Sequence, residues 1–305
     1  MSLEKIQIDN HPLEHMDLSN IIGHKKFLDT YQFLQERTPE ERCLLGEYFN
    51  INKVFKRQAG YDKSKYMSAY ELSNSNNNLI FVAKLVSNTN HNRQEINWYY
   101  YFVQTVLLNE SPHFPLVYHH QECDLCDSRD RAKPQNCLLF FSEKATDNST
   151  EIRGVEELSS MFFQVLMALY LLEKIGITHN DLNLGNILYH SQPEHKNKYI
   201  NYKVNDKDIY VKHFGKLFIL WDFEFMGITG QVDPRDNTEI LSSTYKVDLA
   251  RLIMNIKNIS LKTEIQELYN KHNTISDFID HIIDRTDFFK SQSTEDLIND
   301  IPYIF

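Results

Sequence analysis

Three polar side chains fall where a loop and a strand end would bring oxygen atoms together. Asp181 and Asn186 stand five residues apart in the segment Thr178–Leu188, so one loop can direct both side chains to one point. Asp222 directly follows the apolar run Phe218–Trp221. Two carboxylates and an amide supply the oxygen ligands that Mg²⁺ prefers, and a carboxylate can also act as a base. The spacing therefore indicates a magnesium site that contains its own general base.

The elements around this loop follow from hydrophobic periodicity. Apolar residues recur at helical spacing from Val155 to Lys174, which predicts a helix in front of the loop. Short apolar runs predict strands at Asn186–Tyr189 and Lys216–Trp221, with a charged insertion between them. The loop is thus expected at the junction of a long helix and two strands.

The rest of the chain divides into a strand-rich half and a helix-rich half. Helices are predicted at 25–37, from Thr38 onward, at 92–107 and over several stretches after 245, and strands at 66–72, 79–83, 114–118 and 137–141. Strands followed by helices are typical of an α+β fold, here with two lobes.

The ordered set His179, Asp181, Asn186 and Asp222 resembles the protein-kinase-like superfamily, whose pattern is His-x-Asp-x-x-x-x-Asn followed by Asp-Phe-Gly. The resemblance implies that Asp181 is the catalytic base and that His179 braces the loop. It further implies that Asn186 and Asp222 hold Mg²⁺ or Mn²⁺ against the phosphates of ATP.

A second part of the family pattern lies earlier in the chain. Phe81–Lys84 is similar to the strand motif Val-Ala-Ile-Lys, so Lys84 would contact the α- and β-phosphates and pair with a helix glutamate. Glu95 is the preferred partner, and Glu71 and Glu110 are weaker competitors.

The resemblance also implies where the nucleotide would lie. Phe141, Glu143 and Ala145 occupy the place of the adenine-binding hinge, where the backbone makes most of the contacts. Gly60 and Ser64 fall in the loop that would cover the phosphates.

The family plan implies a two-lobed protein-kinase-like fold with an N-terminal helical extension. The predicted boundaries are 1–50 for the extension, 51–146 for a small N-lobe with an antiparallel sheet, and 147–305 for a helical C-lobe. Asp248 is similar to the buried aspartate that anchors the catalytic loop from a core helix, and a plain helix N-terminal Asp is the alternative.

Several positions depart from the family pattern. The phosphate-covering loop contains only Gly60, and Glu224 replaces the glycine of Asp-Phe-Gly. Asn183 stands where protein kinases carry a lysine that neutralises the γ-phosphate, which replaces a charge with a hydrogen bond. The long interval before Asp222 implies an inserted hairpin at about 191–215, and no Ala-Pro-Glu motif follows.

Three functions remain open on these residues. The first is an atypical Ser/Thr protein kinase, similar to divergent kinases of large DNA viruses and bacterial effectors, which would act on a protein substrate in a host cytosol. The second is a small-molecule or lipid kinase, because Asn-Asp-Leu-x-x-Gly-Asn also resembles aminoglycoside and choline phosphotransferases. The third is a pseudokinase scaffold, which the retained Lys84, Asp181, Asn186 and Asp222 disfavour.

The charge and the glycine positions argue against other classes of binding protein. The 305 residues carry 32 Lys+Arg and 42 Asp+Glu, and a net charge of −10 opposes nucleic-acid binding. The nine glycines contain no G-x-G or G-x-x-x-x-G-K motif, which excludes those phosphate-binding loops.

The sequence also predicts where the protein is found. We find no signal core and no apolar run of ~18 residues, so no transmembrane segment and a cytoplasmic protein are expected. Four cysteines are too few for a disulfide scaffold and predict a reducing compartment.

Two weaker patterns complete the sequence. Cys123 and Cys126 form a single C-x-x-C that could bind Zn²⁺ with His120 or Cys137, although a plain turn between two strands is the preferred interpretation. Basic residues cluster locally and could bind a phosphorylated or polyanionic regulator; they are Lys25, Lys26, Lys53, Lys56, Arg57, Lys63, Lys65, Lys207, Lys212, His213 and Lys216.

Overall fold

The computed structural model describes most of the chain between residues 25 and 285. The described residues are 25–37, 42–43, 45, 49–55, 67–76, 78–107, 111–123, 125–126, 136–231, 245–256, 259–272 and 274–285. The chain divides into two compact units, each described here by itself. Unit 1 comprises 1–110, 115–144 and residue 305, and unit 2 comprises 111–114 and 145–304.

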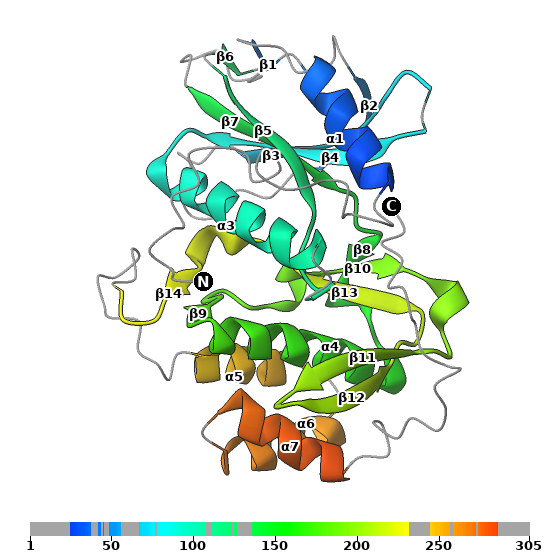
Figure 1. Cartoon of the computed structure of the whole chain (residues 1–305), viewed down its shortest axis with the longest axis vertical. Coiled ribbons are helices and arrows are strands. Elements are labelled where there is room, and N and C mark those ends of the chain that lie inside the picture. Colours follow the sequence, from blue (N-terminus) through cyan, green and yellow to red (C-terminus); the bar gives the residue numbers. More distant parts are fainter. Residues whose placement is uncertain are drawn as a thin grey trace. The chain divides into compact units, whose positions relative to one another are not determined.

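Unit 1 is built on a five-stranded antiparallel sheet with the order β2-β3-β4-β7-β5. Its strands are β2 (Asn50–Phe55), β3 (Met67–Ser73), β4 (Ile80–Ser87), β7 (Cys137–Glu143) and β5 (Val117–Cys123). Helix α1 (Lys25–Arg37) packs along β5, and α3 (Asn90–Leu107) packs against β5 and β7 (Figure 1).

Aromatic side chains fill the core of unit 1. The rings of Phe49, Phe81 and Phe141 meet edge to face with centroids 5.4–5.8 Å apart. Phe27 of α1 contacts Tyr118 of β5 at 5.1 Å, which attaches this helix to the sheet. Edge-to-face rings are a favoured aromatic geometry, and these contacts hold β4 and β7 in a fixed register.

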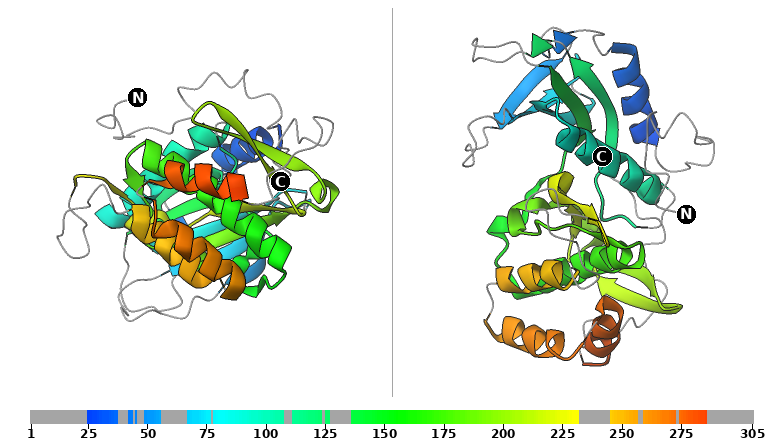
Figure 2. Two further views of the ribbon diagram at one scale, coloured as in Figure 1. Left: turned by 90° about the horizontal axis from the view of Figure 1, so that it is seen from below. Right: turned by 90° about the vertical axis from the view of Figure 1, so that its left-hand side faces the viewer.

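Unit 2 is organised around helix α4 (Val155–Lys174). A three-stranded antiparallel sheet joins β13 (Lys216–Leu220), β10 (Ile187–Ser191) and β8 (Asp147–Asn148), and a two-stranded sheet pairs β9 (Ile177–Thr178) with β14 (Gly227–Ile228). Helices α5 (Tyr245–Asn255) and α7 (Ile275–Arg285) pack against α4, and α6 (Ile259–Tyr269) packs against both of them (Figure 2).

Helix α4 is the buried centre of this unit. Gln164 donates to the backbone carbonyl of Lys216 and accepts from the backbone of Phe218, both at 2.9 Å, which ties the helix to β13. By length and hydropathy α4 could cross a membrane, but 72% of its most apolar window is buried inside the structure. Such burial is typical of a core helix.

Most predicted elements are confirmed. The helices at 25–37 and 155–174 have the predicted bounds, and the charged insertion forms the antiparallel hairpin of β11 (Tyr199–Val204) and β12 (Lys207–Lys212). The strand predicted at 114–118 is displaced: β5 covers Val117–Cys123 and shares only residues 117–118 with the prediction. Residues 111–114 belong instead to unit 2, where the His113 carbonyl accepts from the backbone of Leu220. The described fold is therefore a mixed α and β structure whose larger sheets are antiparallel.

The cysteines also differ from the prediction. The sequence predicted a reducing compartment, but Cys123 and Cys137 are disulfide-bonded. The C-x-x-C was expected in a plain turn between two strands, and in the structure Cys123 ends β5 and Cys126 ends β6. Strand β6 (Leu125–Cys126) pairs in parallel with β1 (Arg42–Cys43). Strand pairing places Cys43 opposite Cys126 and Cys123 opposite Cys137, and the spacing of the cysteines along the chain does not reveal this pairing.

Candidate active site

The side chains of Asp181 and Asn186 are in direct contact. The Asn186 amide nitrogen donates to the Asp181 carboxylate at 3.0 Å and to the Asp181 backbone carbonyl at 2.9 Å. Asn186 is buried and Asp181 is half-buried. These bonds engage Oδ2 of Asp181 and the nitrogen of Asn186, so Oδ1 of Asp181 and the amide oxygen of Asn186 are the atoms left to meet a substrate or a cation.

Asn183 shapes the loop between them. Its amide nitrogen donates to the Asp181 carbonyl at 3.0 Å, and its amide oxygen accepts from the backbone N–H of Gly185 at 2.9 Å. Asn183 thereby caps the short 3₁₀ helix Leu184–Asn186. Both polar ends of this side chain therefore bind loop backbone.

The 178–188 loop is tied to the residues on either side of Asp222. The backbone N–H of Trp221 donates to the Asn186 carbonyl at 2.8 Å, and the Trp221 carbonyl accepts from Nε2 of His179 at 3.0 Å. On the other side, the ring of Phe223 meets the His179 ring edge to face, with centroids 5.9 Å apart. Loop and strand end are thus fixed to each other by three contacts.

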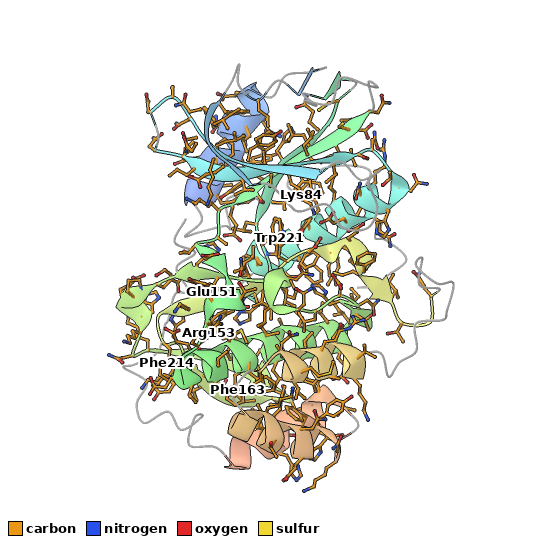
Figure 3. The ribbon with its side chains drawn as sticks, turned by 180° about the vertical axis from the view of Figure 1, so that it is seen from behind. Lys84, Glu151, Arg153, Phe163, Phe214 and Trp221 are labelled. Carbon is orange, nitrogen blue, oxygen red and sulfur yellow. The ribbon has the colours of Figure 1, made fainter. Side chains whose placement is uncertain are left out.

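Asp222 itself has a left-handed backbone, with φ 67° and ψ 74°. This region is sparsely populated by residues other than glycine, and such conformations gather at functional sites. The surrounding contacts of His179 and Asn186 hold it in place. Trp221, labelled in Figure 3, immediately precedes Asp222 and directly follows β13.

Asp248 anchors the loop from the first turn of α5. Its Oδ2 accepts from the backbone N–H groups of His179 at 2.7 Å and Asn180 at 3.3 Å. Arg251 lies 3.8 Å from the Asp248 carboxylate and also donates to the Asn180 carbonyl. Burial raises the pKa of Asp248, and the nearby His179 and the two backbone donors oppose that rise. The Asp248 carboxylate therefore anchors the backbone of the loop at His179 and Asn180.

In unit 1, Lys84 and Glu95 form a buried ion pair. Nζ of Lys84 lies 2.6 Å from Oε1 of Glu95, and the two side chains are 7% and 1% exposed. The Tyr99 hydroxyl donates to the same oxygen at 3.1 Å, and Nζ lies 5.4 Å above the Phe140 ring. Lys84 projects from β4 of the sheet (Figure 3). This pairing joins the strand lysine to the helix glutamate, as the sequence pattern predicted.

Of the two weaker competitors for Lys84, the one that the structure describes pairs with another lysine. Glu71 pairs with Lys144 at 3.0 Å, and Glu110 lies outside the described residues. Sequence reasoning missed Tyr99 and Arg251 as supporting residues. The only signal for Tyr99 was its position one helical turn after Glu95.

The structure describes some of the residues that were predicted to contact the nucleotide. Phe141 is fully buried, and its backbone pairs with both Ala83 and His119 in the sheet. Glu143 is also buried and accepts from the Leu116 backbone at 2.8 Å, so both side chains serve the unit 1 core. Ala145 is half-buried, next to the division between the units, and Gly60 and Ser64 lie outside the described residues.

The oxygen atoms of Asn186 and Asp222 are chemically suited to bind a hard cation. The Asn186 amide oxygen and the Asp222 carboxylate are oxygen ligands of the kind that Mg²⁺ selects. Among the side chains that the structure describes, no three His, Cys, Asp or Glu residues gather as metal ligands. Mg²⁺ commonly keeps several waters and binds through one or two protein groups plus phosphate, so a small protein donor set is sufficient.

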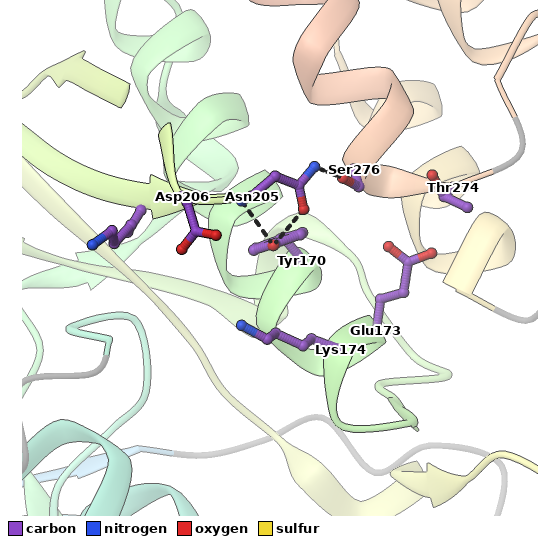
Figure 4. Close-up of a pocket in the computed structure, with 8 residues that line it drawn as sticks. Tyr170, Glu173, Lys174, Asn205, Asp206, Thr274 and Ser276 are labelled. Carbon is purple, nitrogen blue, oxygen red and sulfur yellow. Dashed lines mark hydrogen bonds between the residues drawn. The ribbon is translucent and has the colours of Figure 1, made fainter. Parts of the chain in front are cut away.

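A cavity of about 520 Å³ lies within unit 2 (Figure 4). It is lined by the end of α4, the turn between β11 and β12, and the start of α7, including Tyr170, Glu173, Asn205 and Ser276. None of its lining residues belongs to the predicted site.

The basic cluster of the inserted hairpin is engaged within unit 2. Lys207 pairs with Asp280 at 3.0 Å, Lys216 pairs with Glu157 at 2.7 Å, and Lys212 lies over the Phe214 ring. His213 is fully buried, and burial lowers its pKa to about 3. The described contacts do not gather these residues into one anion pocket. Lys56, Arg57, Lys63 and Lys65 lie outside the described residues, and Lys25 and Lys26 are described by their backbone alone.

Comparison with known proteins gives one informative similarity. No protein-family model matches the chain. The chain is 22% identical over 248 residues to the probable serine/threonine-protein kinase 380R of Invertebrate iridescent virus 6. The match covers 76% of this chain and 45% of the viral protein, so the chain spans about half of that relative's length. This similarity supports a distant relationship of the kinase type.

Proposed function

We propose that the chain is an Mg²⁺- and ATP-dependent phosphotransferase with an atypical, two-lobed kinase fold. The contact between Asp181 and Asn186 carries the proposal, because it joins a base to a metal ligand in one loop. The kinase-type relative and the buried Lys84–Glu95 pair support it independently.

Asp181 would remove the proton of the attacking hydroxyl. As the hydroxyl oxygen bonds to the γ-phosphorus, its proton passes to Oδ1 of Asp181, and the bond from the γ-phosphorus to the leaving ADP oxygen breaks. The bond from Asn186 to Oδ2 fixes the orientation of the carboxylate. A positioned base of this kind contributes about 10²–10⁴-fold to the rate.

The other residues would hold the nucleotide. Bound Mg²⁺ would neutralise phosphate charge, with Asn186 and Asp222 as its protein ligands. Lys84 would contact the α- and β-phosphates, and Glu95 would keep its ammonium group oriented. His179 and Asp248 would position the loop through its backbone and through Trp221.

We further propose a protein Ser/Thr hydroxyl as the acceptor, which the name of the viral relative supports. A small-molecule or lipid acceptor is the second candidate. It is favoured by Asn183, which binds loop backbone where protein kinases carry a phosphate-contacting lysine.

Incubation of the full chain with γ-labelled ATP, Mg²⁺ or Mn²⁺ and a cell lysate tests both proposals. Label in protein bands that is lost with Asp181→Asn supports a protein kinase. Label confined to small molecules or lipids supports the second candidate, and absence of nucleotide binding would contradict a phosphotransferase.

A further inference from the structure

Tyr99 is a buried residue of α3 to which the proposed reaction assigns no role. Its side chain is completely buried, and its hydroxyl lies 3.1 Å from Oε1 of Glu95. The same oxygen accepts from Nζ of Lys84 at 2.6 Å. An ionised carboxylate can only accept, so the phenol is the donor of its bond. One carboxylate oxygen therefore receives two donors, a charged group from β4 and a neutral group from α3 itself.

The Tyr99 ring is held against the sheet of unit 1. It packs on the Phe140 ring of β7, with centroids 5.4 Å apart and planes tilted by 38°. Phe140 is fully buried and lies opposite Lys84 in the ladder of β4 and β7. Nζ of Lys84 lies 5.4 Å from the centroid of the same Phe140 ring. Lys84, Glu95, Tyr99 and Phe140 thus form one packed group, and the enclosed tyrosine ring keeps its hydroxyl directed at the carboxylate.

The two donors to Glu95 would respond differently to a bound nucleotide. Phosphate oxygens would compete with Glu95 for the ammonium group of Lys84, because both are anionic acceptors. The Tyr99 hydroxyl does not depend on the lysine, since Tyr99 and Glu95 are four residues apart on one helix. An ammonium group has three donors, so Lys84 can bind the carboxylate and phosphate oxygens together. Glu95 would therefore keep its orientation while Lys84 turns its other donors toward the phosphates.

We propose that Tyr99 is a positioning residue that acts on the nucleotide phosphates through Glu95 and Lys84. The inference rests on the proposed function, which assigns Lys84 to the α- and β-phosphates. A glutamate held by Tyr99 presents a fixed acceptor to the ammonium group and so limits the positions that Nζ can take. The Tyr99 hydroxyl should therefore matter for a ligand that carries phosphates and not for adenosine, which has none.

The test compares the affinities of the full chain for ATP with Mg²⁺ and for adenosine by calorimetric titration. Tyr99→Phe keeps the ring and removes only the hydroxyl. ATP affinity should fall roughly tenfold, the loss typical of one hydrogen bond to a charged group, and adenosine affinity should stay within about twofold. An unchanged ATP affinity would overturn the proposal, as would equal losses for ATP and adenosine.

Tyr100→Phe is the matched control. Tyr100 is the next residue of α3, it is 1% exposed, and its hydroxyl bonds to Nδ1 of His120 at 2.6 Å. The substitution removes a comparable hydroxyl from the same helix and leaves the contacts of Glu95 in place. The ratio of ATP affinity to adenosine affinity should therefore remain that of the unmodified chain. A Tyr100→Phe variant that lowers this ratio as much as Tyr99→Phe would overturn the proposal.

A double-mutant cycle shows whether the hydroxyl acts through Glu95. In the Glu95→Gln background, Tyr99→Phe should cause no further loss of ATP affinity, because the charged acceptor is already removed. Losses that simply add would overturn action through Glu95. Urea unfolding without nucleotide measures the coupling of the same two residues, and it decides the question if Glu95→Gln binds ATP too weakly to measure.

Failure of this inference is distinguishable from failure of the proposed function. An unmodified chain that binds neither ATP nor adenosine would contradict the proposed function, and the inference with it. An unmodified chain that binds ATP and transfers its γ-phosphate, beside a Tyr99→Phe variant of equal ATP affinity, would contradict only the role of Tyr99.

Discussion

Asn186 donates two hydrogen bonds to Asp181, one to its carboxylate at 3.0 Å and one to its backbone carbonyl at 2.9 Å. The same Asn186 accepts from the backbone of Trp221, the residue before Asp222. One asparagine thus fixes the orientation of the proposed base and the position of the strand end that carries the second proposed metal ligand.

Asp181→Asn should lower the rate of phosphotransfer without weakening nucleotide binding. The substitution keeps an oxygen that can accept from Asn186 but removes the base, so kcat should fall about 10²–10⁴-fold. Nucleotide affinity should stay within a few-fold, because Asp181 is not a proposed phosphate contact. Steady-state kinetics and calorimetric ATP titration measure the two quantities. An unchanged kcat would rule out Asp181 as the base.

The Lys84–Glu95 pair should respond differently to single and double replacement. Lys84→Met leaves a buried carboxylate without its ammonium partner, which typically costs about 3–5 kcal/mol of unfolding free energy. The double variant Lys84→Met/Glu95→Leu should regain much of that stability but no phosphotransfer. Urea unfolding and an activity assay test this together. A double variant with normal activity would show that the pair is purely structural.

Asp248→Ala should loosen the 178–188 loop. It leaves two buried backbone donors, of His179 and Asn180, without their carboxylate acceptor, at about 1–3 kcal/mol each. Hydrogen exchange should increase at both amides. The exposed Glu267→Ala, on α6, is the control and should change stability by less than about 0.5 kcal/mol. Equal effects of the two variants would contradict the anchoring role.

Stability should decrease as pH falls from 6.5 toward 4. Burial lowers the pKa of His113 to about 4 and that of His213 to about 3, each from 6.5. In this range the unfolded chain binds more protons than the folded chain, so acid favours unfolding by roughly 1.4 kcal/mol per pKa unit. Neutral His113 can donate from Nδ1 to the Phe218 carbonyl and accept from Tyr202 at Nε2.

Urea unfolding at several pH values measures this slope. His113→Asn should reduce the slope. A stability that is flat from pH 7 to pH 4 would contradict the buried neutral histidines.

Gly185→Ala should disturb Asn183. A Cβ at residue 185 would lie 3.0 Å from the Asn183 amide oxygen, closer than ordinary contact. The cap of the 3₁₀ helix would have to shift, so kcat should fall severalfold while the melting temperature changes little. Ser191→Ala, on the exposed end of β10, is a matched small substitution that should leave kcat unchanged. A Gly185→Ala variant with full kcat would show that the cap does not position Asp181.

Local patterns predicted much of the candidate site. The spacing of Asp181 and Asn186 indicated one loop, and the loop indeed joins their side chains. The pairing of Lys84 with Glu95 was implied by the resemblance to the kinase strand motif, and the ion pair has that form. The contact of Asp181 with Asn186 is close in sequence, which is why residue spacing could reveal it.

Several of the observed contacts escaped prediction. The register that places Cys43 opposite Cys126 and Cys123 opposite Cys137 depends on strand pairing, which spacing along the chain does not encode. The role of Asn183 depends on backbone bonds inside the loop rather than on its residue type. Likewise, β5 is displaced from its predicted position because residues 111–114 bind to β13 of unit 2.

The central claim is that Asp181 is the base and Asp222 a metal ligand of a phosphotransferase, and phosphotransfer by matched variants tests it most directly. The unmodified chain, Asp181→Asn and Asp222→Asn are incubated with γ-labelled ATP and Mg²⁺, and both transfer and nucleotide binding are measured. The account predicts transfer by the unmodified chain, ATP binding without transfer by Asp181→Asn, and weakened Mg²⁺-dependent ATP binding by Asp222→Asn. Full transfer by both variants would contradict it.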